Sequence, residues 1–276
     1  MKIFNKVVII GTGLIGGSVG LASRKQRLAG EVIGLSRQQK NARLAKKVGA
    51  IDRIGQSLEV VEDADLVILA TPVDTIINLA WEVSKKINKD CIVIDVGSTK
   101  ERIVTKLGAL IPNFLGCHPL AGSEKKGIAN LEDSIFKGSI CIITPTLETN
   151  PRTLNKVKLL WRRLGANVVL LSAKKHDQVL AFTSHLPHAL AFSLINSIPD
   201  QCLLFSSSGL RDTTRISSSD AHLWSEIFLS NRNNLLAALS IFQTKLTVLK
   251  LALRSGNKKQ LAKILVSANK KREKLG

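Results

Sequence analysis

The chain has 276 residues, of which 45% are hydrophobic and 4% aromatic, and its formal net charge is +19. This length and apolar content can bury a sizeable core and favour two domains. A basic chain suggests nucleic acid or acidic lipid as a partner, but the Lys and Arg residues are spread along the whole sequence and aromatic side chains are too few for a base-stacking platform. We therefore expect no nucleic-acid or membrane partner, and a basic surface that attracts small anions.

The sequence contains no segment that we interpret as a targeting signal or a transmembrane helix. The apolar stretch that follows Lys2 and Lys6 is interrupted by glycines, and no uninterrupted apolar run approaches the length needed to span a membrane. The four cysteines are scattered, and three fall in or beside apolar strand-like segments, which favours reduced thiols. We therefore expect a cytoplasmic protein.

A glycine motif, Gly11-x-Gly13-x-x-Gly16, lies between an apolar run at residues 7–10 and a segment at residues 19–27 that can continue as a helix. A strand, a glycine turn and a helix in this order are the context of dinucleotide binding. Gly11 permits the tight turn, Gly13 lets the backbone approach a pyrophosphate, and Gly16 lets the helix pack closely on the strand. The alternative is a glycine-rich turn without a ligand.

Nucleotide specificity is usually decided at the end of the second strand, which we predict at residues 31–36. About twenty positions after Gly16, where an acidic residue would bind the ribose 2′-hydroxyl of NAD, the chain has Ser36 and Arg37. Both can donate hydrogen bonds to a 2′-phosphate, which favours NADP; if Arg37 is only a solvated loop residue, NAD remains the alternative. The expected cofactor-binding residues are Gly11, Gly13, Leu14, Ile15, Gly16, Ser36, Arg37, Thr71 and Pro72.

Apolar strands alternate with helical patterns through the first half of the chain. Further strands are predicted at residues 64–70, 91–96, 114–119, 139–144 and 167–171, and helices at residues 38–48, 73–87, 101–110 and 151–164. This alternation predicts a doubly wound parallel sheet of the Rossmann type, with ligands at the carboxyl ends of its strands.

The pattern changes at about residue 172, after which no clear strand follows. Apolar residues recur at helical spacing in residues 179–195, 222–248 and 260–268. We therefore expect a dinucleotide-binding domain at residues 1–171 and an all-helical domain at residues 172–276. The long apolar pattern must bury its face, which predicts a homodimer through the helical domain.

Polar residues at predicted strand ends are candidates for chemistry. His118 ends one strand and is a candidate proton acceptor, while Ser98 follows another and either accompanies His118 or caps the next helix. In the second half, His185 and His188 are three positions apart and would share a helix face. Without a Cys or carboxylate partner at ligand spacing, a substrate-facing patch is favoured over a metal site.

Together these residues resemble the prephenate/arogenate dehydrogenase family, the oxidoreductases of tyrosine biosynthesis. The glycine fingerprint is shared with many dehydrogenases, but the segments around His118 and between His185 and Arg215 are far more specific. The matching segments span nearly the whole chain in the right order, at residues 11–17, 95–100, 116–124, 176–177, 184–188 and 209–216.

The resemblance implies oxidative decarboxylation of prephenate or arogenate, with hydride transfer to a nicotinamide cofactor. His118 would accept the hydroxyl proton with Ser98 as its hydrogen-bonding partner, and the planar fork of Arg215 would bind a substrate carboxylate. The helical domain would form the dimer and close the cleft. The substrate-binding residues implied are Arg215, His188, Ser123, Glu124, Arg211, Asp212 and His185, with Glu124, Arg211 and Asp212 in a charged network near the entrance.

Some points stay open at the level of sequence. Prephenate and arogenate differ only at the side chain, so the preferred substrate is not decided. No regulatory or mutase domain is recognised, so we expect no feedback inhibition through one. The alternatives are another two-domain NAD(P)-dependent dehydrogenase, of the β-hydroxyacid dehydrogenase or imine reductase type, and a non-catalytic NADP-binding or nucleic-acid-binding protein.

Overall fold

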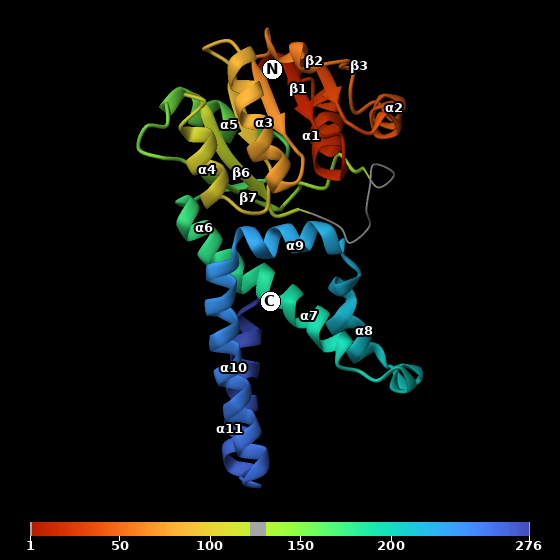
Figure 1. Cartoon of the computed structure of the whole chain (residues 1–276), viewed down its shortest axis with the longest axis vertical. Coiled ribbons are helices and arrows are strands. Elements are labelled where there is room, and N and C mark those ends of the chain that lie inside the picture. The colour runs from red at the N-terminus through yellow and green to blue at the C-terminus, as the bar shows by residue number, and fades with distance from the viewer. Residues whose placement is uncertain (1, 122–130, 276) are drawn as a thin grey trace.

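The computed structural model describes residues 2–121 and 131–275, which form a sheet half and a helical half (Figure 1). The sheet has eight strands in the order β3-β2-β1-β4-β5-β6-β7-β8. The strands are β1 (Phe4–Ile10), β2 (Ala29–Leu35), β3 (Arg53–Ile54), β4 (Leu66–Leu69), β5 (Ile92–Asp95), β6 (Phe114–Pro119), β7 (Ile140–Thr144) and β8 (Asn167–Leu170).

The strand pairing confirms the predicted doubly wound, Rossmann-type sheet, with two corrections. Neighbouring strands are parallel except β6 and β7, which are antiparallel, so the sheet is not parallel throughout. The short strand β3 was not predicted. The helices that connect the strands are α1 (Leu14–Lys25), α2 (Gln39–Lys47), η1 (Leu58–Val61), α3 (Val73–Lys86), α4 (Glu101–Gly108) and α5 (Pro151–Arg163).

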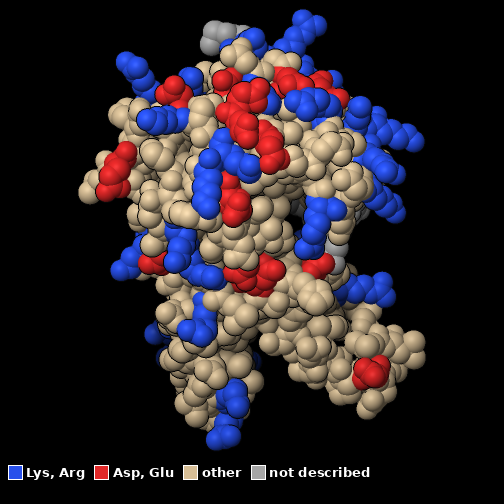
Figure 2. Space-filling view, turned by 45° about the horizontal axis from the view of Figure 1, so that its top comes forward, with Lys and Arg blue, Asp and Glu red and all other residues tan. Residues whose placement is uncertain are grey.

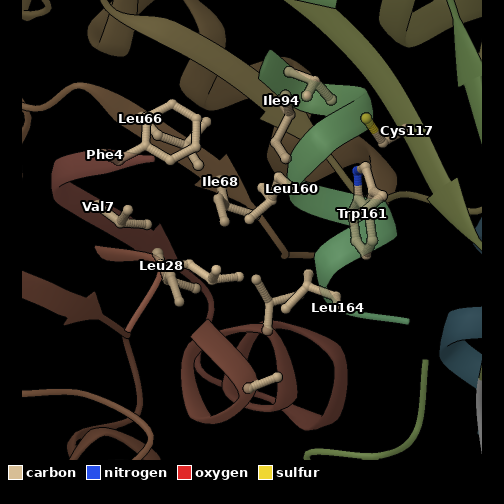
Figure 3. Close-up of a cluster of buried hydrophobic side chains, with 14 of the residues drawn as sticks. Phe4, Val7, Leu28, Leu66, Ile68, Ile94, Cys117, Leu160, Trp161 and Leu164 are labelled. Carbon is tan, nitrogen blue, oxygen red and sulfur yellow. The ribbon is translucent and has the colours of Figure 1, made fainter. Parts of the chain in front are cut away.

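Helices cover both faces of the sheet, which explains why its central strands are apolar at nearly every position. Val7 on β1 belongs to the cluster formed with α1 and α5, and the next residue, Val8, belongs to the cluster formed with α3 and α4. Figure 3 shows the first cluster, where Leu160 and Trp161 of α5 lie over the strands. Each fully buried aliphatic side chain of this kind contributes about 1.5–3 kcal/mol.

The helical half follows β8 and contains no strand among its described residues. Its elements are α6 (Ala173–Leu180), the π-helical turn η3 (Ala181–His185), α7 (Leu186–Asn196), η4 (Asp200–Phe205), α8 (Ser208–Thr214), η5 (Arg215–Ser218), α9 (Ala221–Ser230), α10 (Arg232–Arg254), α11 (Lys258–Arg272) and η6 (Glu273–Leu275). The apolar pattern predicted as one helical stretch at residues 222–248 is divided at Asn231 into α9 and α10. Helix α9 lies against the sheet half and packs on α3, whereas α10 and α11 extend away from it (Figure 1).

Helix α10 has an unusual surface. Its 23 residues are long and apolar enough to cross a membrane by length and composition alone, and only 17% of its most apolar window is buried within the chain. The sequence predicts no membrane-spanning helix, so this candidate comes from the structure. On the face shown in Figure 2, charged side chains are concentrated over the sheet half, and the helical half is mostly uncharged.

Candidate active site

The turn between β1 and α1 carries the glycine motif. Gly11 has a φ angle of +104°, which favours glycine, and its N–H donates to the carbonyl of Leu35 at the end of β2 over 2.8 Å. A Cβ atom on Gly16 would overlap the carbonyl oxygen of Gly11 and lie 3.0 Å from Ile9, so α1 packs on β1 only because residue 16 has no side chain. Around Gly13 the position of a Cβ atom is open for 4 Å among the described residues. The predicted turn and packing roles of Gly11 and Gly16 are confirmed.

Two threonine hydroxyls near this turn are buried without a hydrogen-bond partner among the described residues: Oγ1 of Thr12 and Oγ1 of Thr71. Buried hydroxyls nearly always have a partner, so these two indicate a polar ligand over the turn. Leu14 and Ile15 begin α1, whose first turn has no acidic side chain, so its free N–H groups favour an anion. The donor groups and the open backbone at Gly13 fit a dinucleotide.

The remaining residues predicted to bind the cofactor flank this turn. Ser36 and Arg37 follow β2 directly, and the bond between Gly11 and Leu35 holds the end of β2 beside the glycine turn. The Arg37 side chain is exposed. Pro72 precedes the first turn of α3, next to Thr71. The structure therefore brings the expected nucleotide residues to one edge of the sheet.

His118 and Ser98 also lie at this edge, because β5 and β6 are parallel neighbours. His118 occupies the next-to-last position of β6 and is partly exposed. Its Nδ1 atom lies 2.8 Å from Nε2 of His176, which belongs to α6 in the helical half. Among the described residues, no hydrogen bond joins Ser98 to His118, so the partner seen for this ring differs from the one that the resemblance implies.

Ser98 does not cap the helix that follows it. Helix α4 begins at Glu101, and the carboxylate of Asp177 accepts hydrogen bonds from the backbone N–H groups of Lys100 (2.8 Å) and Glu101 (2.9 Å). The capping alternative for Ser98 is therefore wrong, since a carboxylate from the helical half occupies that position.

Burial and, to a smaller extent, the groups around His118 keep its ring neutral. A fully buried ion pair joins Lys100 to Asp95, the last residue of β5. Burial raises the pKa of Asp95, and the attraction of Lys100 opposes this rise. Burial lowers the pKa of His118 well below 6.5, and the neighbouring His176 and Lys100 lower it further. His118 is therefore neutral at pH 7 and able to accept a proton.

His185 and His188 both lie beside Trp224 of α9. The ring of His188 stacks on Trp224 with 3.5 Å between centroids, and its Nδ1 is 2.9 Å from the carbonyl of Ser184. His185 is 1% exposed, contacts the edge of Trp224, and has Nδ1 3.0 Å from Nδ2 of Asn231. Burial lowers the pKa of His185 to about 4. The shared location of the two rings agrees with their spacing, but His185 is more enclosed than a surface patch requires.

The other predicted substrate residues are less closely gathered. Arg211 and Asp212 are exposed on α8, and the exposed Arg215 begins η5, which packs on α7. Ser123 and Glu124 lie outside the described residues. No group of three or more His, Cys, Asp or Glu side chains in the described part of the chain is arranged to hold a metal ion.

Several side chains at this site have no role that the sequence predicts. His176 and Asp177 form one of the short segments that resemble the dehydrogenase family, and Lys100 is the last residue of another such segment. Trp224 could have been found from its position on an apolar helical pattern, since the chain has only three tryptophans. Asn231 gives no local signal.

A glycine turn that fits a dinucleotide, with a neutral histidine at the same edge of a Rossmann-type sheet, defines an NAD(P)-dependent dehydrogenase with a helical second domain. The chain belongs to the prephenate dehydrogenase family. Residues 19–170 match the model of the prephenate dehydrogenase nucleotide-binding domain, and residues 172–267 match that of the prephenate dehydrogenase dimerization domain.

Individual relatives agree with this assignment. The prephenate dehydrogenase of Bacillus subtilis is 34% identical over 83% of this chain, and the match spans 65% of that enzyme's length. The cyclohexadienyl dehydrogenase of Zymomonas mobilis is 32% identical, with 92% of this chain and 90% of that protein covered. The crystal structure of prephenate dehydrogenase from A. aeolicus, in complex with hydroxyphenyl propionate and NAD+, superposes with a TM-score of 0.93 at 33% identity, over 99% of this chain and 98% of that one.

Membership in this family makes the protein a nicotinamide-dependent oxidoreductase of tyrosine biosynthesis that acts by oxidative decarboxylation. It decides against the alternatives of a β-hydroxyacid dehydrogenase, an imine reductase and a non-catalytic binding protein.

Proposed function

We propose that the protein converts prephenate or arogenate with NADP as the oxidant and His118 as the proton acceptor. The observation that carries this proposal is the position of His118, a partly exposed residue near the end of β6, at the edge of the sheet that also carries the glycine turn. Burial lowers the pKa of His118, which keeps its ring neutral. Because the ring has a second hydrogen-bonding nitrogen besides Nδ1, it can accept the proton of the substrate hydroxyl. Ser98, at the same edge, is the second residue that we assign to this step.

The cofactor would be held by the β1–α1 turn and the ends of β2 and β4. Thr12 and Thr71 offer buried hydroxyls without a described partner, and the backbone at Gly13 leaves room for a pyrophosphate. When bound, the nicotinamide supplies the acceptor for the hydride that leaves the hydroxyl-bearing ring carbon of the substrate. The protein's own contribution is orientation of the reactants and removal of the hydroxyl proton.

The preference for NADP rests on Ser36 and Arg37, which follow β2 where an acidic residue would mark NAD. A charge-assisted hydrogen bond to the 2′-phosphate contributes about 1.5–3 kcal/mol, so we expect kcat/KM to favour NADP by about 10- to 100-fold. Arg37→Ala should raise the KM for NADP. The control is Arg163→Ala, which should leave this KM unchanged, because Arg163 is an exposed residue of α5 and not part of the predicted cofactor site. The combined change Ser36→Asp and Arg37→Ile should reverse the preference. An NAD preference in the wild-type enzyme would contradict this assignment.

The substrate is an anion, and we propose that Arg215 binds one of its carboxylates. Arg215 begins η5, which packs on α7, the helix that carries His188. His188 has Nδ1 engaged with a carbonyl, which leaves Nε2 for the substrate. The full proposed substrate set remains Arg215, His188, Ser123, Glu124, Arg211, Asp212 and His185.

We also propose that the protein is a cytoplasmic homodimer, divided into domains at residues 1–171 and 172–276. Large apolar side chains are exposed along α10 and α11: Leu236, Ile241, Leu246, Val248, Leu251, Leu253, Leu265 and Val266. An exposed apolar face of this extent is typical of a subunit interface, and it lies in the segment that matches the dimerization domain.

One set of assays tests the reaction. The purified protein is mixed with prephenate or arogenate, each with NAD or NADP, and the absorbance of the reduced cofactor is followed. Turnover of at least one pair is expected, with NADP preferred. His118→Asn should lower kcat by about 10²–10⁴-fold with little effect on cofactor binding, as for the loss of a positioned base. Near-normal turnover by this variant would remove His118 from the mechanism.

A further inference from the structure

A line of hydrogen bonds connects His118 to the beginning of α4 through two residues of α6. Nδ1 of His118 is 2.8 Å from Nε2 of His176, and Nδ1 of His176 is 2.8 Å from Oδ1 of Asp177. The carboxylate of Asp177 also accepts the backbone N–H groups of Lys100 and Glu101. His176 and Asp177 are both buried, so water does not compete for these bonds.

These hydrogen bonds have a fixed direction, because the ionised carboxylate of Asp177 can only accept hydrogen bonds. Backbone N–H groups donate to both oxygens of Asp177. Burial raises the pKa of Asp177, but the hydrogen bonds from His176 and from those N–H groups outweigh burial, so the net shift lowers the pKa. Its carboxylate is therefore ionised and accepts the proton on Nδ1 of His176. Burial lowers the pKa of His176, so this ring is neutral and its Nε2 has a lone pair.

The same reasoning fixes the ring of His118. Since Nε2 of His176 is an acceptor, the bond between the two rings requires a proton on Nδ1 of His118. A neutral imidazole carries one proton, so Nε2 of His118 is unprotonated. Without His176 the two neutral forms of His118 would both be available, and one of them has no basic nitrogen at Nε2.

We propose that His176 and Asp177 are positioning residues that hold His118 in the form protonated at Nδ1, so that its Nε2 atom is the base for the substrate hydroxyl. This rests on the proposed role of His118 as proton acceptor. In the reaction, the hydroxyl proton forms a bond with Nε2 while the O–H bond breaks, and the Nδ1 proton stays in its bond to His176. The positive charge on His118 is then stabilised by the carboxylate of Asp177 through the ring of His176.

Other charged and titratable groups face these rings from neighbouring elements. They are Asp95 at the end of β5, Lys100 before α4 and His185 in η3. Lys100 lowers the pKa of both rings, while Asp95 raises that of His176 and is itself held in an ion pair with Lys100. Asp177 is the carboxylate that is hydrogen-bonded to the ring of His176.

The state of the rings can be observed without substrate or cofactor. Isotope-labelled histidine in the wild-type protein should give ring-nitrogen chemical shifts of a protonated Nδ1 and an unprotonated Nε2 for both His118 and His176. Assignments come from the spectra of His118→Asn and His176→Gln. The opposite form of His118, with the proton on Nε2, would overturn the proposal whatever the activity of the enzyme.

Asp177→Asn tests the direction in which the hydrogen bonds between Asp177, His176 and His118 run. Oδ1 of Asp177 lies within hydrogen-bond distance of both the Lys100 N–H and Nδ1 of His176, so the amide has two orientations. With NH₂ at this position it donates to Nδ1 of His176 and reverses the form of His118. With its oxygen at this position it keeps the ring forms, but it removes the negative charge that stabilises protonated His118, and the histidine chemical shifts distinguish the two cases. We expect kcat to fall by about 10²–10⁴-fold, as where an Asp-to-Asn exchange imposes the wrong histidine form, with the KM values changing less than about threefold. A kcat within about threefold of wild type would overturn the proposal.

A matched control distinguishes the effect of Asp177 on the histidine rings from its effect on the contact between the sheet half and the helical half. The hydroxyls of Thr99 and Ser230 also join the halves, over 2.8 Å, but touch neither histidine. Ser230→Ala should keep kcat and the histidine shifts of the wild type. If it lowers kcat as much as Asp177→Asn does, the effect is attachment and the proposal is wrong.

Two substitutions of His176 cover the case in which Asp177→Asn does not fold. His176→Gln can accept from His118 through its carbonyl oxygen and donate to Asp177 through its amide, so it should retain kcat within about tenfold. His176→Leu offers no acceptor and should lose about 10²-fold or more. Equal kcat for the two variants would overturn the proposal. By contrast, turnover by His118→Asn would refute the proposed function itself, so the two failures are distinguishable.

Discussion

His185 makes the fold sensitive to acid, and replacing it should remove a defined part of that sensitivity. The ring is 1% exposed, and its Nδ1 faces the amide NH₂ of Asn231, which also donates to the backbone carbonyl of Asp177. Burial lowers the pKa of His185 from 6.5 to about 4, and a proton on Nδ1 would oppose the bond from Asn231. Between these values the unfolded chain binds a proton that the folded protein does not, so stability falls as the pH falls.

The size of the effect follows from the shift. A change of about 2.5 pKa units corresponds to about 3 kcal/mol in full, of which about 2 kcal/mol is lost by pH 5 and almost none above pH 7.5. His185→Asn keeps an acceptor for Asn231 but carries no charge. Loss of the ring should lower the free energy of unfolding of this variant by the same amount at every pH. As the pH falls from 7.5 to 5, its free energy of unfolding should therefore rise by about 2 kcal/mol relative to that of the wild type.

Urea unfolding followed by far-ultraviolet circular dichroism measures this difference, at one protein concentration because a dimer makes stability concentration-dependent. His222→Asn is the control, since His222 is exposed on α9 and its replacement should leave the pH dependence of the wild type. Parallel stability curves for wild type and His185→Asn over this pH range would refute the reasoning.

The remaining predictions concern the substrate anchor, the glycine turn and the subunit interface. Arg215→Ala should mainly raise the substrate KM, by the equivalent of about 2–4 kcal/mol, and an unchanged KM in folded protein would refute the assignment. Gly16→Ala should lower the free energy of unfolding by about 1–3 kcal/mol, because its Cβ would overlap backbone, while Gly13→Ala should fold normally and lose cofactor affinity in a fluorescence titration. Light scattering should report a dimer at micromolar concentration and a smaller species for Leu251→Glu; a wild-type monomer would contradict the interface.

The sheet could be predicted because burial and local pattern agree in its central strands. The strands β4 and β5 are four-residue segments buried at every position, and the helices between strands have clear apolar faces. Strand β3 escaped prediction because two residues, Arg53 and Ile54, carry no pattern and gain their conformation from pairing with β2. The reversed direction of β7 could not be predicted, because alternation of side chains is the same in parallel and antiparallel strands.

The helical half shows a different limit. Residues 222–248 have a continuous helical pattern, but the helix ends at Ser230 because Asn231 adopts φ −113° and ψ 30°. Its side chain then reaches the carbonyl of Asp177 and the ring of His185. Asparagine is compatible with a helix on propensity alone, so the break comes from contacts with segments about fifty residues earlier in the chain.

The nucleotide site and the chemical site differ in how they are encoded, which explains why one was predicted in more detail. The glycine turn is local: the roles of Gly11 and Gly16 follow from a strand and a helix that are adjacent in sequence. The base depends on a contact between His118 and His176, which are 58 positions apart and belong to different halves of the molecule. Residue types suggest that His118 can accept a proton, but the nitrogen that does so is set by the direction of hydrogen bonds that begin at Asp177. That direction exists only once α6 has docked on α4, so no spacing within the sequence could reveal it.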